Sequence, residues 1–113
     1  MYDPGTADGW KGRVRSEAHA HRPATILTGP VQVCMVFTLP RPKAHFLKSG
    51  LRPTAPSYHT GKPDSDNLAK AVLDALGDTA QWWKDDAQVA RLSVLKNYGD
   101  EAGCRIVISE MLP

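Results

Sequence analysis

Residues 31–39 carry the sequence pattern that most restricts the fold of this 113-residue chain. Apolar side chains stand at every second position of the segment, and Pro40 and Pro42 follow it directly. Side chains of an extended strand point alternately to the two sides of a sheet, so every second residue shares one face. We therefore expect a β-strand whose core face consists of Val31, Val33, Met35, Phe37 and Leu39.

Two segments have the residue spacing of helices. The first covers residues 10–21 and the second covers residues 67–76. Asp66 is the expected N-cap of the second helix, and Gly77 is its expected C-terminal stop. The apolar stripe of this second helix consists of Leu68, Ala69, Val72, Leu73 and Leu76.

Two further segments, residues 89–97 and residues 104–109, alternate like strands and flank a loop with two glycines. We interpret them as an antiparallel hairpin. Together these elements predict an α+β fold, a small mixed sheet with one main helix, that of residues 67–76, packed on it.

Length and composition agree with a single domain over residues 1–113. The chain is 42% hydrophobic and 23% charged, which is typical of a globular domain with one core. No apolar run is long enough to span a bilayer and the first residues lack a signal segment, so we expect a cytoplasmic protein with no membrane partner. Cys34 and Cys104 are too few for a disulfide framework or a zinc site, and we expect both to be small buried side chains.

Charge is distributed unevenly along the chain. Residues 1–62 hold nine Lys/Arg and three Asp/Glu, whereas residues 63–113 hold five Lys/Arg and nine Asp/Glu. A basic half can attract a polyanion, and clustered carboxylates can hold a divalent cation.

Residues 41–62 show no periodicity, and an insert of this length in a small domain is usually functional or disordered. Its cations stand among aromatic rings, a mixture that suits contact with phosphates and unstacked bases. A mobile surface loop with no partner is the alternative. The side chains concerned are Lys43, His45, Phe46, Lys48, Arg52, Tyr58 and His59.

The candidate chemistry lies in two short strings, KPDSDNLAK at residues 62–70 and KDDAQV at residues 84–89. Magnesium prefers carboxylate oxygens and usually takes only a few protein ligands. Asp64 and Asp66 are two residues apart at the expected start of the helix, so both carboxylates could face one ion.

The second string could supply a third carboxylate. Asp85 or Asp86 would complete the cluster if the strand that follows began beside the N-terminus of the helix. Three carboxylates that close would repel one another, and a bound cation removes that penalty. Lys70, one helical turn after Asp66, could reach the scissile phosphate or orient the attacking water.

Each of these residues also has a simpler structural explanation. Asp66 can serve only as a cap, Lys70 and Asp74 can extend a surface charge ladder, and the later acidic pair can form a solvated turn. An EF-hand is excluded, because the fifth, sixth and twelfth positions counted from Asp64 are Leu, Ala and Ala. The sequence contains no convincing covalent nucleophile, glycine-rich phosphate loop or zinc-finger histidine set.

Taken together, the two strings resemble the RusA family of Holliday-junction resolvases, which is common in bacteriophages and prophages. The shared pattern is D-x-D-N-x-x-K from Asp64 to Lys70, followed by D-D-x-Q-V from Asp85 to Val89 and then Lys96. The resemblance covers about the C-terminal two-thirds of the chain.

This resemblance implies a RusA-like fold and a homodimer that binds four-way DNA junctions and nicks them symmetrically with Mg²⁺, for which Mn²⁺ could substitute. By position it implies that Asp64, Asp66 and Asp86 are metal ligands and catalytic residues, and that Lys70 is the basic catalytic residue. The reaction would be metal-assisted hydrolysis, with a bound water attacking the phosphate in line. The expected DNA contacts are Lys62, just before the motif, with Lys43, Lys48, Arg52 and Lys96.

Two alternatives stay open. One is a DNA-structure-binding protein of a phage or prophage with an impaired site, and the other is a domain whose carboxylates act only as caps and turns. Members of the family usually open with a strand that precedes the region matching residues 2–5, whereas the present sequence begins there, which predicts an incomplete sheet. The insert at residues 41–62 is longer than in the shortest relatives, so junction selectivity can differ.

Overall fold

A computed structural model describes residues 7–112 of the chain. It contains α-helices, 3₁₀ turns (η1 and η3), one π-helical turn (η2) and five strands, so the predicted α+β class is confirmed. In chain order the elements are α1 (Ala7–Ala20), β1 (Val31–Pro40), η1 (Lys43–His45), β2 (Phe46–Leu47), β3 (Gly50–Leu51), α2 (Ser65–Leu73), η2 (Asp74–Thr79), η3 (Asp86–Gln88), β4 (Val89–Gly99) and β5 (Gly103–Glu110).

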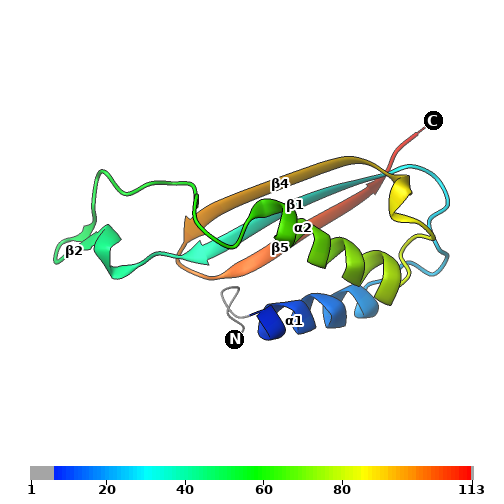
Figure 1. The fold of residues 1–113 in the computed structure, drawn as a ribbon, viewed down its shortest axis with the longest axis horizontal. Helices are drawn as coiled ribbons and strands as arrows, with labels where there is room; N and C mark the ends of the chain where they lie inside the picture. The colour runs from blue at the N-terminus through cyan, green and yellow to red at the C-terminus, as the bar shows by residue number, and fades with distance from the viewer. Residues whose placement is uncertain (1–6, 113) are drawn as a thin grey trace.

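The main sheet has three strands in the order β4-β1-β5 (Figure 1). β1 pairs with β4 in parallel and with β5 in antiparallel orientation, so the sheet is mixed as predicted. The predicted hairpin of the last two strands is wrong, because β1 lies between them. The link from Gly99 to Gly103 is long enough for this, since two strand spacings amount to only about 10 Å.

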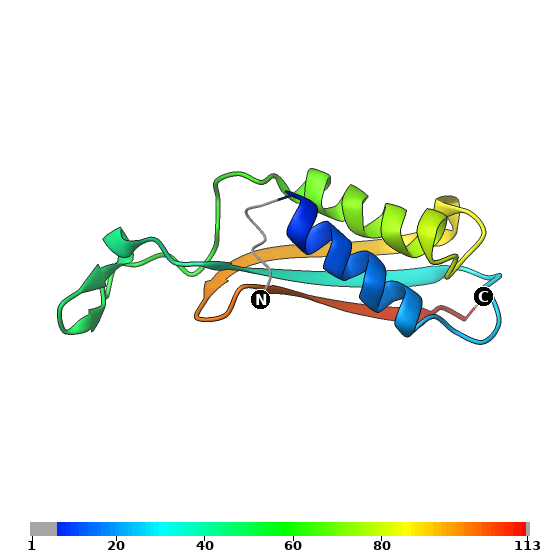
Figure 2. The same ribbon diagram turned by 90° about the horizontal axis from the view of Figure 1, so that it is seen from below.

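Both helices lie on the same face of this sheet (Figure 2). The prediction of one main helix was therefore incomplete, because α1 packs beside α2 and contributes Trp10, Val14 and Ala18 to the core. No helix among residues 7–112 is long and apolar enough to cross a membrane. Between α1 and β5 the packing leaves a cleft of about 490 Å³ that is lined mainly by apolar side chains.

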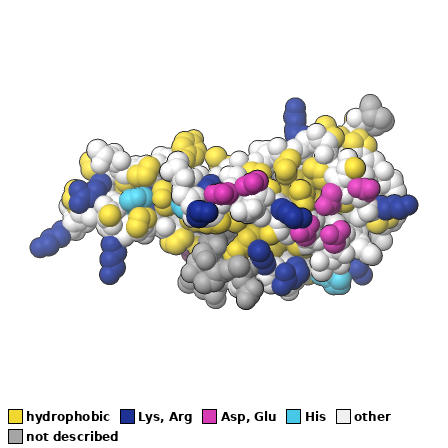
Figure 3. All heavy atoms as spheres, in the orientation of Figure 1, with side chains coloured by type: hydrophobic (Ala, Val, Ile, Leu, Met, Phe, Trp, Pro, Cys, Tyr) yellow, Lys and Arg dark blue, Asp and Glu magenta, His cyan; other side chains and the backbone are white. Residues whose placement is uncertain are grey.

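The segment between β1 and α2, residues 41–62, forms an arm that projects beyond the end of the main sheet and whose last residues, from Ser57 on, return alongside β4 (Figures 1 and 2). Strands β2 and β3 pair within it, with Phe46 opposite Leu51. In the face shown in Figure 3, Lys, Arg, His and apolar side chains cover the arm, whereas Asp and Glu lie over the body of the protein. The arm (residues 41–62) therefore has both charge and shape distinct from the rest of the chain.

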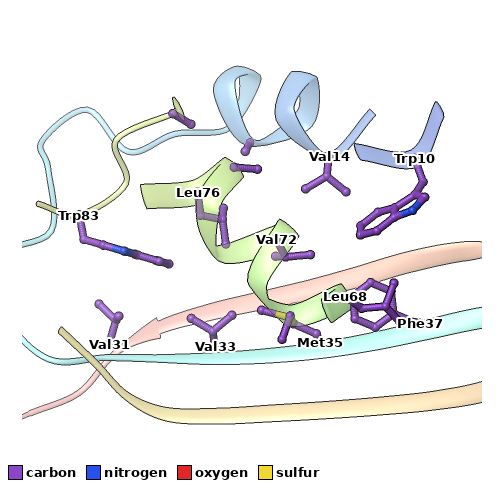
Figure 4. Packing of buried hydrophobic residues seen from close by; sticks show 14 of the residues in the cluster. Trp10, Val14, Val31, Val33, Met35, Phe37, Leu68, Val72, Leu76 and Trp83 are labelled. Carbon is purple, nitrogen blue, oxygen red and sulfur yellow. The ribbon is translucent and has the colours of Figure 1, made fainter. Parts of the chain in front are cut away.

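The predicted core face of β1 is confirmed, because its five side chains are at most 6% exposed. They pack against Leu68, Val72 and Leu76 of the second helix and against Trp83 (Figure 4). Burial of one such side chain stabilises a fold by roughly 1.5–3 kcal/mol. Since no other strand has a fully buried face, β1 occupies the centre of the sheet and β4 and β5 take its edges.

The second helix begins and ends at other residues than predicted. Asp64, not Asp66, is the N-cap, because the backbone of Ser65 is already helical. Gly77 does not stop the helix, which continues from Leu73 through the π-helical turn η2. Gly77 is buried there and faces the side chains of Trp83 and Asp86. Because it has no side chain, it lets the segment that contains Trp83 and Asp86 pack closely against the helix.

The cysteines are unpaired, as expected, but both are half-buried rather than buried. Cys34 lies on the sheet face opposite the helices, and Cys104 lies opposite Phe37 on the helix side. Burial raises the pKa of the Cys104 thiol to about 12, so this thiol stays protonated and unreactive at neutral pH. A structural role for Cys104 follows.

Substitution of Gly77 by alanine should destabilise the protein by about 1–3 kcal/mol, because the added Cβ would overlap the Asp86 carboxylate and lie 2.9 Å from Trp83 Nε1. Gly12→Ala is the matched control, since its Cβ would meet only the tip of Arg15 at 3.9 Å in a helix that favours alanine. Thermal unfolding of both variants checks this. Equal melting temperatures for the two variants would contradict the close approach at Gly77.

Candidate functional site

Asp64 and Asp66 lie together at the N-terminus of α2 and are exposed. Asp64 makes no side-chain cap hydrogen bond, although its main-chain carbonyl accepts the N–H of Leu68 at 3.1 Å. Neither carboxylate has a hydrogen bond or ion pair to another of the described residues. Two unpartnered carboxylates at the positive end of a helix dipole form a favourable position for negative charge and for a hard cation beside it.

Lys96 fixes the segment that leads into these carboxylates. Its Nζ donates hydrogen bonds to the carbonyls of Gly61 and Pro63, both at 2.8 Å. Because Lys96 lies in register with Phe37, its side chain comes from the helix side of β4. The sequence predicted Lys96 as a DNA contact, but the structure uses its ammonium to hold the backbone just before Asp64.

Lys70 lies one helical turn after Asp66 on the exposed side of α2. Its Nζ is 3.5 Å from Asp74 Oδ2, and the side chains of Lys70 and Asp74 are 77% and 45% exposed. An ion pair this exposed stabilises the helix by only a few tenths of a kcal/mol. The surface ladder expected from the spacing is therefore present in part, and it leaves the ammonium of Lys70 free to move toward a ligand.

Asp86 lies at the other end of the helix from Asp64 and Asp66. Its Oδ1 accepts a hydrogen bond from Trp83 Nε1 at 2.7 Å and packs against Gly77. Gly77 is eleven residues after Asp66, which corresponds to roughly 16 Å along a helix. Among residues 7–112, no three carboxylate, histidine or cysteine side chains come close enough to hold a metal ion.

A three-carboxylate cluster required the strand after Asp86 to begin beside the N-terminus of the helix. Within one chain it does not begin there. Only a short connection separates η2 from β4, so β4 begins beside the C-terminal end of the helix (Figure 1). β4 then runs back along the helix and reaches its N-terminal end only near Lys96. The expectation failed because the spacing along the sequence did not reveal the direction of this strand.

The segment around Asp86 is well ordered by its own hydrogen bonds. Asp85 caps η3, because its Oδ1 accepts the N–H of Ala87 at 2.8 Å. Gln88 completes a capping box, with Oε1 accepting the N–H of Asp85. Gln88 Nε2 also donates to the carbonyls of Leu27 and Gly29. Asp85 is therefore occupied as a cap, whereas Asp86 keeps one carboxylate oxygen without a partner among the described residues.

Gln88 and Trp83 are structural residues that the sequence interpretation missed. The spacing of an acidic residue and Gln three positions later is a capping-box signal and could have identified Gln88. Nothing in the sequence predicted that the indole N–H of Trp83 would orient Asp86, because that contact depends on the turn between them.

Most predicted DNA contacts lie on or beside the arm. Lys43, Lys48 and Lys62 are exposed and have no ion-pair partner among the described residues. Arg52 donates from Nε to the carbonyl of Ala44 at 2.9 Å, and its remaining donors are exposed. These four cations are accessible to a polyanion.

Chemically, the arrangement offers two candidate halves of a metal site. One half has the two free carboxylates of Asp64 and Asp66 with Lys70 beside them, and the other has the single oriented carboxylate of Asp86. Hard oxygen donors with a hydrogen-bonded outer shell fit Mg²⁺ or Mn²⁺. The residues present thus suit a hard divalent cation, although one chain does not bring all three together.

Lys96→Met should lower the free energy of unfolding by about 1–2 kcal/mol and expose residues 57–64 to proteases, because two carbonyls lose a charged donor. Arg91→Met is the control on the same strand, since Arg91 is exposed and has no partner among the described residues. Urea unfolding and limited proteolysis compare the two. If both variants behave alike, Lys96 does not anchor this segment.

Comparison with known proteins identifies a family and a relative of this chain. The family described as Endodeoxyribonuclease RusA matches residues 1–109. A Bacillus subtilis (strain 168) protein described as Uncharacterized protein YqaN is 38% identical over 120 residues, covering 98% of this chain and 79% of the relative. The chain therefore belongs to the RusA endodeoxyribonuclease family.

Proposed function

We propose that this protein is a Mg²⁺-dependent endonuclease that cuts four-way DNA junctions by paired nicks and acts as a homodimer. Membership of a family of endodeoxyribonucleases supports nuclease activity. The single observation that carries the finer proposal is the pair of unpartnered carboxylates, Asp64 and Asp66, at the point where the cationic arm returns to the body. A phosphodiester held by the arm would lie next to these carboxylates.

The third carboxylate of the site, Asp86, would come from the second copy in the dimer. Within one chain Asp86 lies at the opposite end of α2 and η2 from Asp64 and Asp66. A two-fold axis that brings the two ends together would create two equivalent sites, each with Asp64 and Asp66 of one copy and Asp86 of the other. Two sites related in this way suit symmetric cleavage of two strands.

The residues of the chain would then have distinct roles. Asp64, Asp66 and Asp86 would hold the cation, which when bound lowers the pKa of a water and withdraws charge from the phosphate. Trp83 would keep Asp86 in one orientation, and Lys96 would keep the approach to Asp64 fixed. Lys70, mobile on its exposed helix face, would stabilise negative charge that develops on the phosphate.

A second candidate is a protein that binds branched DNA without cutting it. The separation of Asp86 from Asp64 and Asp66 within one chain favours this alternative if the protein acts as a monomer. Such a protein would bind junctions in a salt-dependent manner and would not nick them when Mg²⁺ is added.

The test is a cleavage assay on a synthetic four-way junction and a linear duplex, each with and without Mg²⁺. The wild-type protein should nick the junction only with the metal. Asp66→Asn should retain junction binding and lose cleavage by roughly 100-fold or more, because the substitution removes one negative charge from the ligand set.

Asp100→Asn is the matched control, since this exposed aspartate lies in the loop between β4 and β5 and belongs to neither half of the proposed site. It should cleave like the wild type. Unchanged cleavage by Asp66→Asn would remove Asp66 from the site, and junction binding without any nicking by the wild type would favour the binding protein.

A further inference from the structure

The tip of the arm exposes large apolar side chains that the fold does not require. Phe46, Leu47 and Leu51 are 44%, 43% and 49% exposed. They lie on the two short strands of the β2–β3 hairpin, with Phe46 directly opposite Leu51. None of them belongs to the core cluster or packs against it. An exposed apolar cluster at the end of a projecting element indicates a binding surface.

The charge around this cluster indicates what kind of partner it meets. Lys43 and Lys48 flank the apolar residues, and the sequence contains no Asp or Glu between Glu17 and Asp64. Figure 3 shows apolar and basic side chains mixed over the arm. Apolar groups between cations, without any carboxylate, match a polyanion that also exposes apolar faces. Nucleic acid with unstacked bases has both properties.

The two ends of the arm, residues 41–45 and 56–59, form a stem that holds this tip in a defined position. Arg41 Nη1 donates to the carbonyl of Pro56 at 2.7 Å, and its guanidinium lies 5.3 Å from the centre of the Tyr98 ring. His45 and His59 pack edge-on against the same ring at 4.8 and 5.2 Å. Tyr98 belongs to β4, so the stem is fastened to the end of the main sheet.

The stem also connects the tip to the carboxylates. His59 N–H donates to the carbonyl of Lys96, whose own ammonium holds Gly61 and Pro63 just before Asp64. Burial, and secondly the charge of Lys96, lower the pKa of His59, which favours the neutral form of this ring. The backbone that connects the tip to Asp64 is therefore held in place by β4. DNA that contacts the tip can extend along this backbone to Asp64.

We infer that the hairpin tip, residues 46–51, is a wedge that inserts Phe46 and Leu51 between bases at a DNA branch point while Lys43 and Lys48 contact the flanking phosphates. This inference rests on the proposed action on DNA, and it names the feature of the substrate that is recognised. Insertion of an apolar side chain into a continuous duplex costs base stacking, whereas stacking at a branch point is already interrupted. The wedge thus provides selectivity for branched DNA without reading any sequence.

The experiment compares the wild type with the double variant Phe46→Ser/Leu51→Ser, using a four-way junction that carries 2-aminopurine at the branch and a linear duplex of the same sequence. Binding is measured in EDTA, so that no cleavage occurs. Wild-type protein should increase 2-aminopurine fluorescence and prefer the junction. The double variant should lose the fluorescence increase and about tenfold or more of its preference for the junction, with little change in affinity for the duplex.

Leu92→Ser/Leu95→Ser is the matched control, because these leucines of β4 are 45% and 40% exposed but lie outside the arm. It should retain the preference and the fluorescence change. Lys43→Gln/Lys48→Gln should instead weaken binding to both DNAs and reduce the salt slope of log K by about two. Circular dichroism and thermal unfolding verify that each variant is folded.

Three outcomes would overturn the wedge. Wild-type behaviour of the Phe46→Ser/Leu51→Ser variant on both DNAs would show that the tip does not meet the bases. Loss of self-association by this variant, measured by sedimentation, would make the tip a contact between two copies. If the wild type neither binds junctions preferentially nor cleaves them with Mg²⁺, the proposed function itself fails. This outcome is distinguishable from the first two because it is observed with the wild-type protein alone.

Discussion

The burial of one face of β1 beneath two helices is the constraint on which the rest of this structure depends. The five core side chains of the strand are almost inaccessible to water, so β1 takes the centre of the sheet and β4 and β5 take its edges. α2 and the turn η2 that continues it cover this sheet, and residues 80–88 join η2 to β4. β4 must therefore start where the helix ends and run back beside it. The direction of β4 fixes the position of every residue in the second acidic string.

That direction separates the two halves of the proposed metal site. Asp64 and Asp66 lie at the end of the body from which the arm projects, and Asp86 lies at the other end, beside Gly77 and Trp83. In the proposed function, a second copy completes the site. A two-fold dimer would complete two sites at once, and paired nicks need two sites.

Local patterns in the sequence predicted the local structure well. The alternation of residues 31–39 and the stripe of Leu68, Val72 and Leu76 gave the correct strand and core face, because periodicity depends only on neighbouring residues. The strand order, the role of Gly77 and the location of Asp86 were not predictable in this way. Each depends on contacts between segments far apart in the sequence. The motif identified the family and the candidate residues, but it contained no information about how far apart the fold places them.

The central claim, that Asp86 acts across a dimer, is tested most directly by mixing two inactive variants. Asp66→Asn and Asp86→Asn chains, refolded together in equal amounts, should form mixed dimers with one intact site each and recover nicking at about a quarter of the wild-type sites. A mixture of Asp64→Asn with Asp66→Asn should recover none, because these residues belong to the same half. Failure of the first mixture to nick a junction, with mixed dimers present, would contradict the account.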